Sequence, residues 1–546
     1  SFHELNYINK IKYIAGSSGG SWATVVYSYY QNDNITDNQM LGKIIFPEDI
    51  IFSNLSYIEE GCVRSYVNSS YILTGPLFSD WLDAVQAIYF TPAGILRNTP
   101  FSYDQATVAD IKSRNSGLAS KNFLLLRGKF GNTNGIDTRP FPIIQGTLIG
   151  PLDLIPFTPI NRNYTLVEWT PLSAGVAYSN EVVFRDLNNT KSISTIVGGL
   201  IEPFAFNSLT SPTIGLPAGQ PNGTLTIPGP TTTTQCDWAL GSGTSSWAVG
   251  CAVSASVVPA IQLTVGTVNY WAPSESIPKV SKYTVGDGAG VSNTNLISLI
   301  QRGVKTIIAF VSTSTPLQNS TNWNPVTDTL TQDVIDFTVP AWFGYYPSDL
   351  SEVNDVSYDL KNSHIFDSSE WIPMVTSLQN AQAIGKGNII SMVHTTINND
   401  KYGIIAGQKI KVVWIYLGRA LQWEAKLNDE MKNLVVPKDD PYNQANTIDS
   451  GPFRHFPHYP TAIASETAQK ANLLADLVGW TIYQNQDIIR DALGLDPLYP
   501  TQQPTSSSND KTKSSNDDDN NFANSTGGIV LFVFIGLLVL GLIFGA

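Results

Sequence analysis

Residues 12–22 read KYIAGSSGGSW, and this stretch decides how the rest of the chain is organised. A short apolar run over 13–15 predicts a β-strand, and a helix is expected from Ser21 to about Tyr30. The turn between them follows the pattern G-x-S-x-G, with its members at Gly16, Ser18 and Gly20. This strand–turn–helix device presents a serine hydroxyl on a tight turn, where glycine tolerates a sharp bend and a close neighbouring backbone.

Ser18 is therefore the candidate nucleophile of the chain. The helix that follows it aims free N–H groups and the positive end of its dipole at whatever the hydroxyl attacks. The N–H of Gly19 is the expected donor to an oxyanion at this helix start. A Gly/Ser turn without chemistry has the same five letters, so the motif needs a partner base elsewhere in the chain.

Composition and charge restrict the class of protein. The chain has 546 residues, of which 42% are hydrophobic, enough for a large core. A net charge of −13 argues against a nucleic-acid partner and against electrostatic docking on anionic lipid. Only 14% of the residues are charged, and eight N-x-[ST] sequons indicate a secreted or luminal glycoprotein. The sequons are at Asn34, Asn54, Asn68, Asn163, Asn188, Asn222, Asn319 and Asn524.

The three cysteines favour an oxidising compartment and offer no metal site. Cys236 and Cys251 are close enough in sequence to close a small disulfide loop. Cys62 is left over and is interpreted as a buried apolar residue. Because no CxxC or zinc-type spacing occurs, we expect no structural metal site.

The C-terminal part of the sequence predicts attachment to a membrane. Residues 529–546 read IVLFVFIGLLVLGLIFGA without a charge, and Gly527 and Gly528 extend this run to about the length that a bilayer core requires. Residues 501–528 are polar and of low complexity, and we interpret them as a linker after a main domain over 1–500. A single transmembrane helix and a GPI-signal tail both fit. Either one places the bulk of the chain outside the cytosol.

Apolar runs alternate with helical patterns along the main domain, which is typical of an α/β fold. Strands are expected at 123–127, 141–149, 164–169, 304–311 and 411–417. Helices are expected at 78–90, 295–302, 421–434 and 468–483. The run VKTIIAFV at 304–311 has the continuous apolar character of a buried parallel strand.

A serine nucleophile needs a base, and the sequence offers two kinds. Of the five histidines, His458 comes last in a Ser, Asp, His order. The alternative is a carboxylate, and Asp287 lies in the glycine-rich turn VGDGAG ahead of a short helix and the strand at 304–311. A solvated Asp-Gly turn without a role fits the same local sequence, so the residues alone leave the choice open.

The two motifs together resemble the catalytic domain of cytosolic phospholipase A2 and fungal phospholipase B, and more distantly that of the patatins. The resemblance rests on GSSGGSW at 16–22 and on DGAG at 287–290, followed by NTNLISLIQRGVKTIIAF. Weaker similarities are EWTPLSAG at 168–175, GGLIEPFAFNS at 198–208 and FPHYPT at 456–461. The resemblance covers most of residues 1 to about 495. It implies a patatin-like layered sheet with helices on both faces, Ser18 as nucleophile and Asp287 as base.

This resemblance implies a serine acyl-ester hydrolase of phospholipids or lysophospholipids that works with a Ser-Asp dyad and no cofactor. The family carries a glycine-rich oxyanion loop and a phosphate-binding arginine upstream, and only seventeen residues precede Ser18. We therefore expect an N-terminal part to be missing and the 1–546 chain to turn over slowly. Two alternatives stay open: a Ser-His-Asp esterase ending at His458, and a catalytically inactive surface glycoprotein on the same scaffold.

Overall fold

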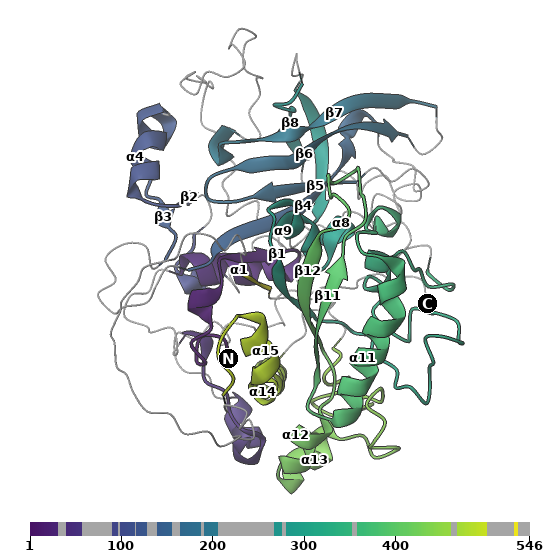
Figure 1. Ribbon diagram of the computed structural model, residues 1–546. Helices are drawn as coiled ribbons and strands as arrows, with labels where there is room; N and C mark the ends of the chain where they lie inside the picture. Colours follow the sequence, from purple (N-terminus) through teal and green to yellow (C-terminus); the bar gives the residue numbers. More distant parts are fainter. Residues whose placement is uncertain are drawn as a thin grey trace, which may run out of the picture.

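The computed structural model describes residues 1–30, 40–56, 90–96, 99–114, 116–127, 139–154, 164–186, 190–205, 267–275, 280–351, 358–459, 467–498 and 529–532. These residues form a mixed β-sheet with helices packed on both of its faces (Figure 1). The expectation of an α/β fold is confirmed at this level.

The main sheet has 11 strands, in the order β11-β12-β10-β13-β1-β4-β5-β6-β7, with β9 pairing with β4 and β8. Its central strands run parallel: β12 (Lys409–Tyr416), β10 (Thr306–Val311), β13 (Ile529–Phe532), β1 (Tyr13–Gly16) and β4 (Phe141–Pro151). The others join antiparallel: β5 (Thr165–Trp169), β6 (Ala174–Arg185), β7 (Ser192–Ile201), β8 (Thr267–Tyr270), β9 (Ser281–Asp287) and β11 (Asn388–Thr395). The expected strands at 141–149, 164–169, 304–311 and 411–417 are confirmed.

The alternation of apolar side chains along the central strands explains the two helical layers. Ile307 of β10 belongs to a core with α9 (Leu296–Gln301) and α11 (Trp371–Ile384). Its neighbour Ile308 packs on the other face, in a core with α14 (Ala468–Gln484) and α15 (Gln486–Ala492). α1 (Gly19–Tyr29) packs on β1 and β4. Because each central strand is apolar on both faces, it requires cover on both sides.

The helix expected over 421–434 is two helices, α12 (Leu421–Lys426) and α13 (Asp429–Val435). The break follows from an N-cap signal inside the apolar pattern. Leu427 is extended, and the Asn428 side chain accepts a hydrogen bond from the Met431 N–H, 2.9 Å away, which starts a new helix. The described residues also include the α-helices α4 (Gln105–Arg114) and α8 (Ala289–Ser292).

The edges of the fold show shorter elements. β2 (Phe101–Ser102) and β3 (Leu124–Leu125) form a two-stranded sheet, so the strand expected at 123–127 is confirmed over two residues only. The helix expected at 78–90 lies outside the described residues except for its last residue.

The C-terminal apolar run contributes one described element. Ile529–Phe532 forms β13, which pairs in parallel with β1 on one side and with β10 on the other. The structure therefore differs at these four residues from the expected membrane segment, and residues 533–546 lie outside the described part of the chain. A search of the described helices found none with both the length and the apolar character needed to cross a bilayer.

The features expected of an extracellular protein fall largely on undescribed residues. All three cysteines and six of the eight sequons lie there. Asn54 is exposed, whereas Asn319 is partly buried and its side-chain amide donates to Asn443 Oδ1 at 3.2 Å. Of these two asparagines, Asn54 is the accessible one.

Candidate active site

Ser18 lies on the sharp turn that joins β1 to α1. β1 ends at Gly16 and α1 begins at Gly19, two residues before the helix start that the sequence predicted. Ser18 has φ 54° and ψ −136°, a backbone conformation that residues other than glycine rarely adopt. Such strain costs on the order of 1–3 kcal/mol, persists where the surroundings impose it, and gathers at functional sites.

Backbone groups and short polar side chains of α1 surround this turn. A Cβ atom on Gly16 would lie 2.3 Å from the carbonyl oxygen of Gly20 and 2.6 Å from Oγ1 of Thr24. The hydroxyl of Ser21 donates to the carbonyl oxygen of Gly16 at 3.0 Å. The chain can thus fold back on itself at this point only with glycine at position 16.

Asp287 is the last residue of β9 and is buried, with 1% of its surface exposed. Its Oδ1 accepts a hydrogen bond from the N–H of Ala289 at 2.8 Å, and its backbone carbonyl accepts one from the Thr147 hydroxyl at 2.6 Å. Ser18 lies close enough to this carboxylate that its side chain and its backbone both act to lower the pKa of Asp287. These contacts are longer or less well aligned than ordinary hydrogen bonds, because within the described part of the chain Oδ2 of Asp287 has no hydrogen-bond partner of ordinary geometry. Catalytic hydrogen bonds are often long before substrate binds.

Burial raises the pKa of Asp287 to about 7, and the hydrogen bonds from Ala289 and Ser18 offset this only in part. The low-polarity cover has a visible origin: Phe337, Tyr358 and Leu360 pack against Ala289 at the start of α8. Burial, together with the negative charges of Asp287 and Asp336, also raises the pKa of Tyr358. A carboxyl group with a pKa near neutrality can exchange a proton with a substrate at physiological pH.

The register of the sheet explains why Ser18 and Asp287 meet. β1 pairs with the first part of β4, where Gly16 is opposite Ile144. β9 pairs with the later part, from Gly146 opposite Asp287 to Pro151, while β5 pairs with Ile144 to Leu148 along the other edge of β4. β1 and β9 therefore point toward one another along one edge of β4, and the residues at their ends are about 7 Å apart at the usual rise of a strand.

Two further contacts join the serine turn to the segment after Asp287. The Ser17 hydroxyl lies 3.5 Å from the carbonyl oxygen of Ser292. The side chain of Asn295 donates to the carbonyl oxygen of Ala15 at 3.2 Å. Asn295 itself has φ 52°, a left-handed conformation that asparagine tolerates better than most residues. The nucleophile strand and the aspartate loop are thus tied by hydrogen bonds across their junction.

Three polar residues next to Ser18 and Asp287 belong to no motif in the sequence: Gln145, Thr147 and Asn295. A signal for the first two exists: polar residues interrupt the run FPIIQGTLI, which is otherwise apolar on both faces. Asn295 has no such signal, since its role depends on a contact with a strand 280 residues away.

The histidines are engaged in other contacts. Nδ1 of His458 lies 2.9 Å from the carbonyl oxygen of Thr313. His394 lies between Glu370 and Trp414, each 3.0 Å away, and His364 contacts the carbonyl oxygen of Phe366 at 2.9 Å. In the described part of the chain, none of these side chains hydrogen-bonds to Ser18. Among the described residues, Nε2 of His458 and Oδ2 of Asp287 are both buried without a hydrogen-bond partner, and Ser18 is among the groups that affect the pKa of Asp287.

Gly19, the expected oxyanion donor, is the first residue of α1. The N–H groups of Gly20 and Ser21 donate back to the carbonyl oxygens of Ser17 and Ser18, both at 2.9 Å, and the N–H of Gly19 makes no such turn bond. Across the described ranges, no three His, Cys, Asp or Glu side chains gather in a way that could hold a metal ion.

We expect a Gly288→Ala variant to melt at a lower temperature than the native protein. A Cβ atom at this position would lie 2.6 Å from the carbonyl oxygen of Gln145, so the aspartate loop or β4 would have to shift. Overpacking of this kind costs about 1–3 kcal/mol. Thermal unfolding checks the result, with Gly479→Ala in α14 as control, because a Cβ there would first meet the flexible side chain of Ile44, 3.2 Å away. A Gly288→Ala protein with the native melting temperature would contradict the close approach.

A comparison of the chain with models of known protein families found no match, and a comparison with curated proteins found none either.

Proposed function

We propose that the chain is a serine acyl-ester hydrolase that acts on phospholipids or lysophospholipids through a Ser18–Asp287 dyad. The observation that carries the proposal is the strained Ser18 at a strand–helix turn, next to a buried carboxyl group whose pKa is raised to about 7. Hydroxyl groups become nucleophiles when an adjacent base removes their proton, and Asp287 is the base in reach. The choice of a lipid ester rests on the resemblance of the two motifs to the phospholipase A2 and B family.

In the proposed reaction the ionised Asp287 takes the proton of the Ser18 hydroxyl as Oγ attacks the ester carbonyl carbon. Negative charge develops on the carbonyl oxygen, and the N–H of Gly19 is placed at the helix start to stabilise it. The alcohol leaves with the proton that Asp287 holds, and an acyl group remains on Ser18. Asp287 then deprotonates a water molecule, whose attack releases the fatty acid and restores Ser18.

Covalent capture tests the proposal directly. A fluorophosphonate probe reacts with activated serine hydroxyls, so incubation followed by peptide mass spectrometry should place the adduct on Ser18. Release of fatty acid from lysophosphatidylcholine micelles should follow the same protein through purification. An adduct on another serine, or none at all, would favour the reading of the chain as an inactive surface glycoprotein.

The pH dependence gives a separate expected result. Asp287 must be ionised to act as base, so kcat/KM should rise with pH through an acid limb near 7 and level off above it. The pKa of His458 is lowered by burial to about 4. If His458 were the base, kcat/KM would therefore not change with pH near 7. The pH profile of hydrolysis of a soluble ester distinguishes the two.

A further inference from the structure

One β4 residue, Gln145, lies between the end of the nucleophile strand and the end of the aspartate strand. Its neighbours Ile144 and Gly146 pair with Gly16 and Asp287 respectively. Across the sheet on the other side, Gln145 is paired with Glu168 of β5. Residues directly opposite in an antiparallel pair point to the same face, which here is the face that carries α9.

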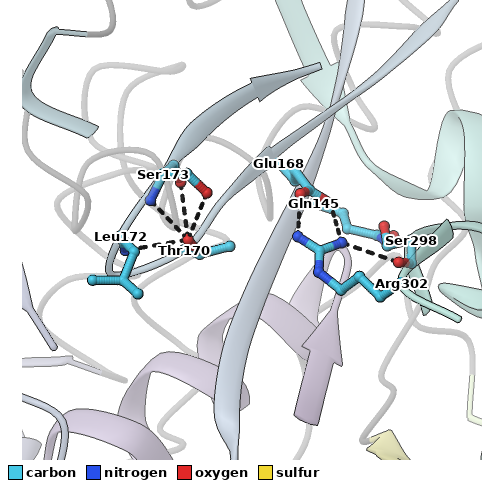
Figure 2. Close-up of polar contacts among 7 residues, drawn as sticks. All are labelled: Gln145, Glu168, Thr170, Leu172, Ser173, Ser298 and Arg302. Carbon is cyan, nitrogen blue, oxygen red and sulfur yellow. Dashed lines mark hydrogen bonds and ion pairs between the residues drawn. The ribbon is translucent and has the colours of Figure 1, made fainter. Parts of the chain in front are cut away.

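Figure 2 shows Gln145 and Glu168 side by side on neighbouring strands, with Ser298 and Arg302 facing them from the helical segment that packs on these strands. The guanidinium group of Arg302 donates to both carboxylate oxygens of Glu168, and its contact with Oε2 measures 2.9 Å. The same guanidinium donates to the carbonyl oxygen of Ser298 at 3.0 Å. The side-chain amide of Gln145 donates to the Ser298 hydroxyl. The four residues form one connected network, in which Ser298 binds Gln145 through its hydroxyl and Arg302 through its backbone carbonyl.

The network holds both ends of the segment that carries the aspartate. At its start, Gly288 passes so close to the Gln145 carbonyl that a Cβ has no room. At its end, Arg302 is bound to Glu168. Residues 287–302, with α8 and α9, therefore lie against the Gln145 backbone at their start and are ion-paired with Glu168 at their end. This arrangement fixes the direction in which Asp287 leaves β9.

We propose that Glu168 and Arg302 are positioning residues of the Ser18–Asp287 dyad. The inference rests on the function proposed above. The ion pair holds α9 against β4 and β5, and thereby holds the Asp287 carboxylate where it meets the Ser18 hydroxyl. Neither side chain exchanges a proton with the substrate.

The burial of the pair supports a role in geometry. The exposed fraction of Glu168 is 1% and that of the Arg302 side chain is 19%. Burial acts to lower the pKa of Arg302, but the charge and hydrogen bonds of Glu168 outweigh it and raise this pKa. Removing charges from water offsets most of their attraction, so such a pair adds little net stability. A two-pronged contact between guanidinium and carboxylate does fix distance and orientation.

The test removes both charges together, so that neither is left buried alone. The variant is Glu168→Gln/Arg302→Met, and the chain offers a matched control in Arg419→Met/Glu424→Gln. Arg419 binds Glu424 through two contacts of 2.7 and 2.6 Å, and its exposed fraction is 1%. This second pair holds the loop at 441–446, and neither member contacts the dyad in the described hydrogen bonds.

Three measurements are made on wild type and on both double variants: the rate of fluorophosphonate adduct formation at Ser18, kcat and KM for a soluble ester, and the melting temperature. In the Glu168/Arg302 variant we expect kcat and the labelling rate to fall about 100-fold, as for a misplacement of about 1 Å, with KM unchanged. The control variant should keep both rates. Arg302→Lys should recover part of kcat, because it restores the charge but not the two-pronged contact.

Equal losses in the two double variants would overturn the inference, since the ion pair would then serve stability alone. Native rates in the Glu168/Arg302 variant would overturn it as well. Both outcomes leave the proposed function standing if wild type is labelled at Ser18. A wild-type protein that is neither labelled nor active would instead refute the proposed function, and the positioning role with it.

Discussion

An Asp287→Asn variant should lose ester hydrolysis by about 10²- to 10⁴-fold and should melt at a higher temperature than the native protein above pH 7. The activity falls because asparagine cannot take the proton of Ser18. The stability rises because the ionised carboxyl group is buried at a cost. Activity and melting temperature are thus expected to change in opposite directions, which loss of folding cannot produce.

The direction of the pH effect follows from the two pKa values of this carboxyl group. It is about 3.9 for an aspartate in an unfolded chain and about 7 for Asp287 in the folded one. Between these values the folded state binds more protons, so stability falls as pH rises from about 4 to about 7. A shift of this size corresponds to a loss of roughly 4 kcal/mol, taken as an upper value. Asparagine has no charge and escapes this loss.

Melting curves at pH 5 and pH 8 measure the effect. The difference between Asp287→Asn and native protein should grow with pH. Asp110→Asn serves as control, because Asp110 is exposed and pairs with Arg114 on the surface. Equal differences at the two pH values would mean that the Asp287 carboxyl group is not held at a raised pKa.

The second large effect is expected for Ser18→Ala. It removes the attacking oxygen, so hydrolysis should fall by about 10⁴- to 10⁶-fold, while the fold remains because the hydroxyl makes only loose contacts. His458→Gln should keep kcat within about threefold. The reason is geometric: His458 is buried, and its Nδ1 contacts the carbonyl oxygen of Thr313 after β10.

Rates per mole of folded protein, with circular dichroism as the check of folding, compare the two variants. If His458→Gln reduced the rate of hydrolysis as much as Ser18→Ala does, the Ser-Asp dyad would be refuted and the Ser-His-Asp alternative favoured. A Ser18→Ala protein that still hydrolyses ester at the native rate would remove Ser18 from the chemistry altogether.

The parts of the fold that the sequence could predict are those that depend on the pattern of neighbouring residues. The central strands β1, β4, β10 and β12 can be predicted because each is a continuous apolar run. Ser18 and Asp287 can be identified because each lies in a glycine-rich turn. The antiparallel β5–β7 region and the insertion of β13 between β1 and β10 depend on pairings between distant segments. Alternation of strand and helix patterns contains no information on those pairings.

The same limit applies to the site. Glu168 and Arg302 each stand in a segment that the sequence analysis singled out, EWTPLSAG and the QRGVK turn. Nothing local to either segment predicts that the two side chains meet, because their contact follows from β5 and α9 packing on β4. A segment can thus be singled out in the sequence, while the residue that contacts it in the fold cannot be predicted from the sequence.

The end-to-end meeting of β1 and β9 on β4 has a consequence for the order of events during folding. The hydrogen bond from Asn295 to Ala15 joins residues 280 positions apart. Bringing them together reduces the conformational entropy of the chain before any contact between them can stabilise it. Local helices and hairpins form earlier, on much shorter timescales. In a refolding experiment the ability to react with a fluorophosphonate should therefore return after the burial of tryptophan side chains, and it reports the completion of the whole sheet.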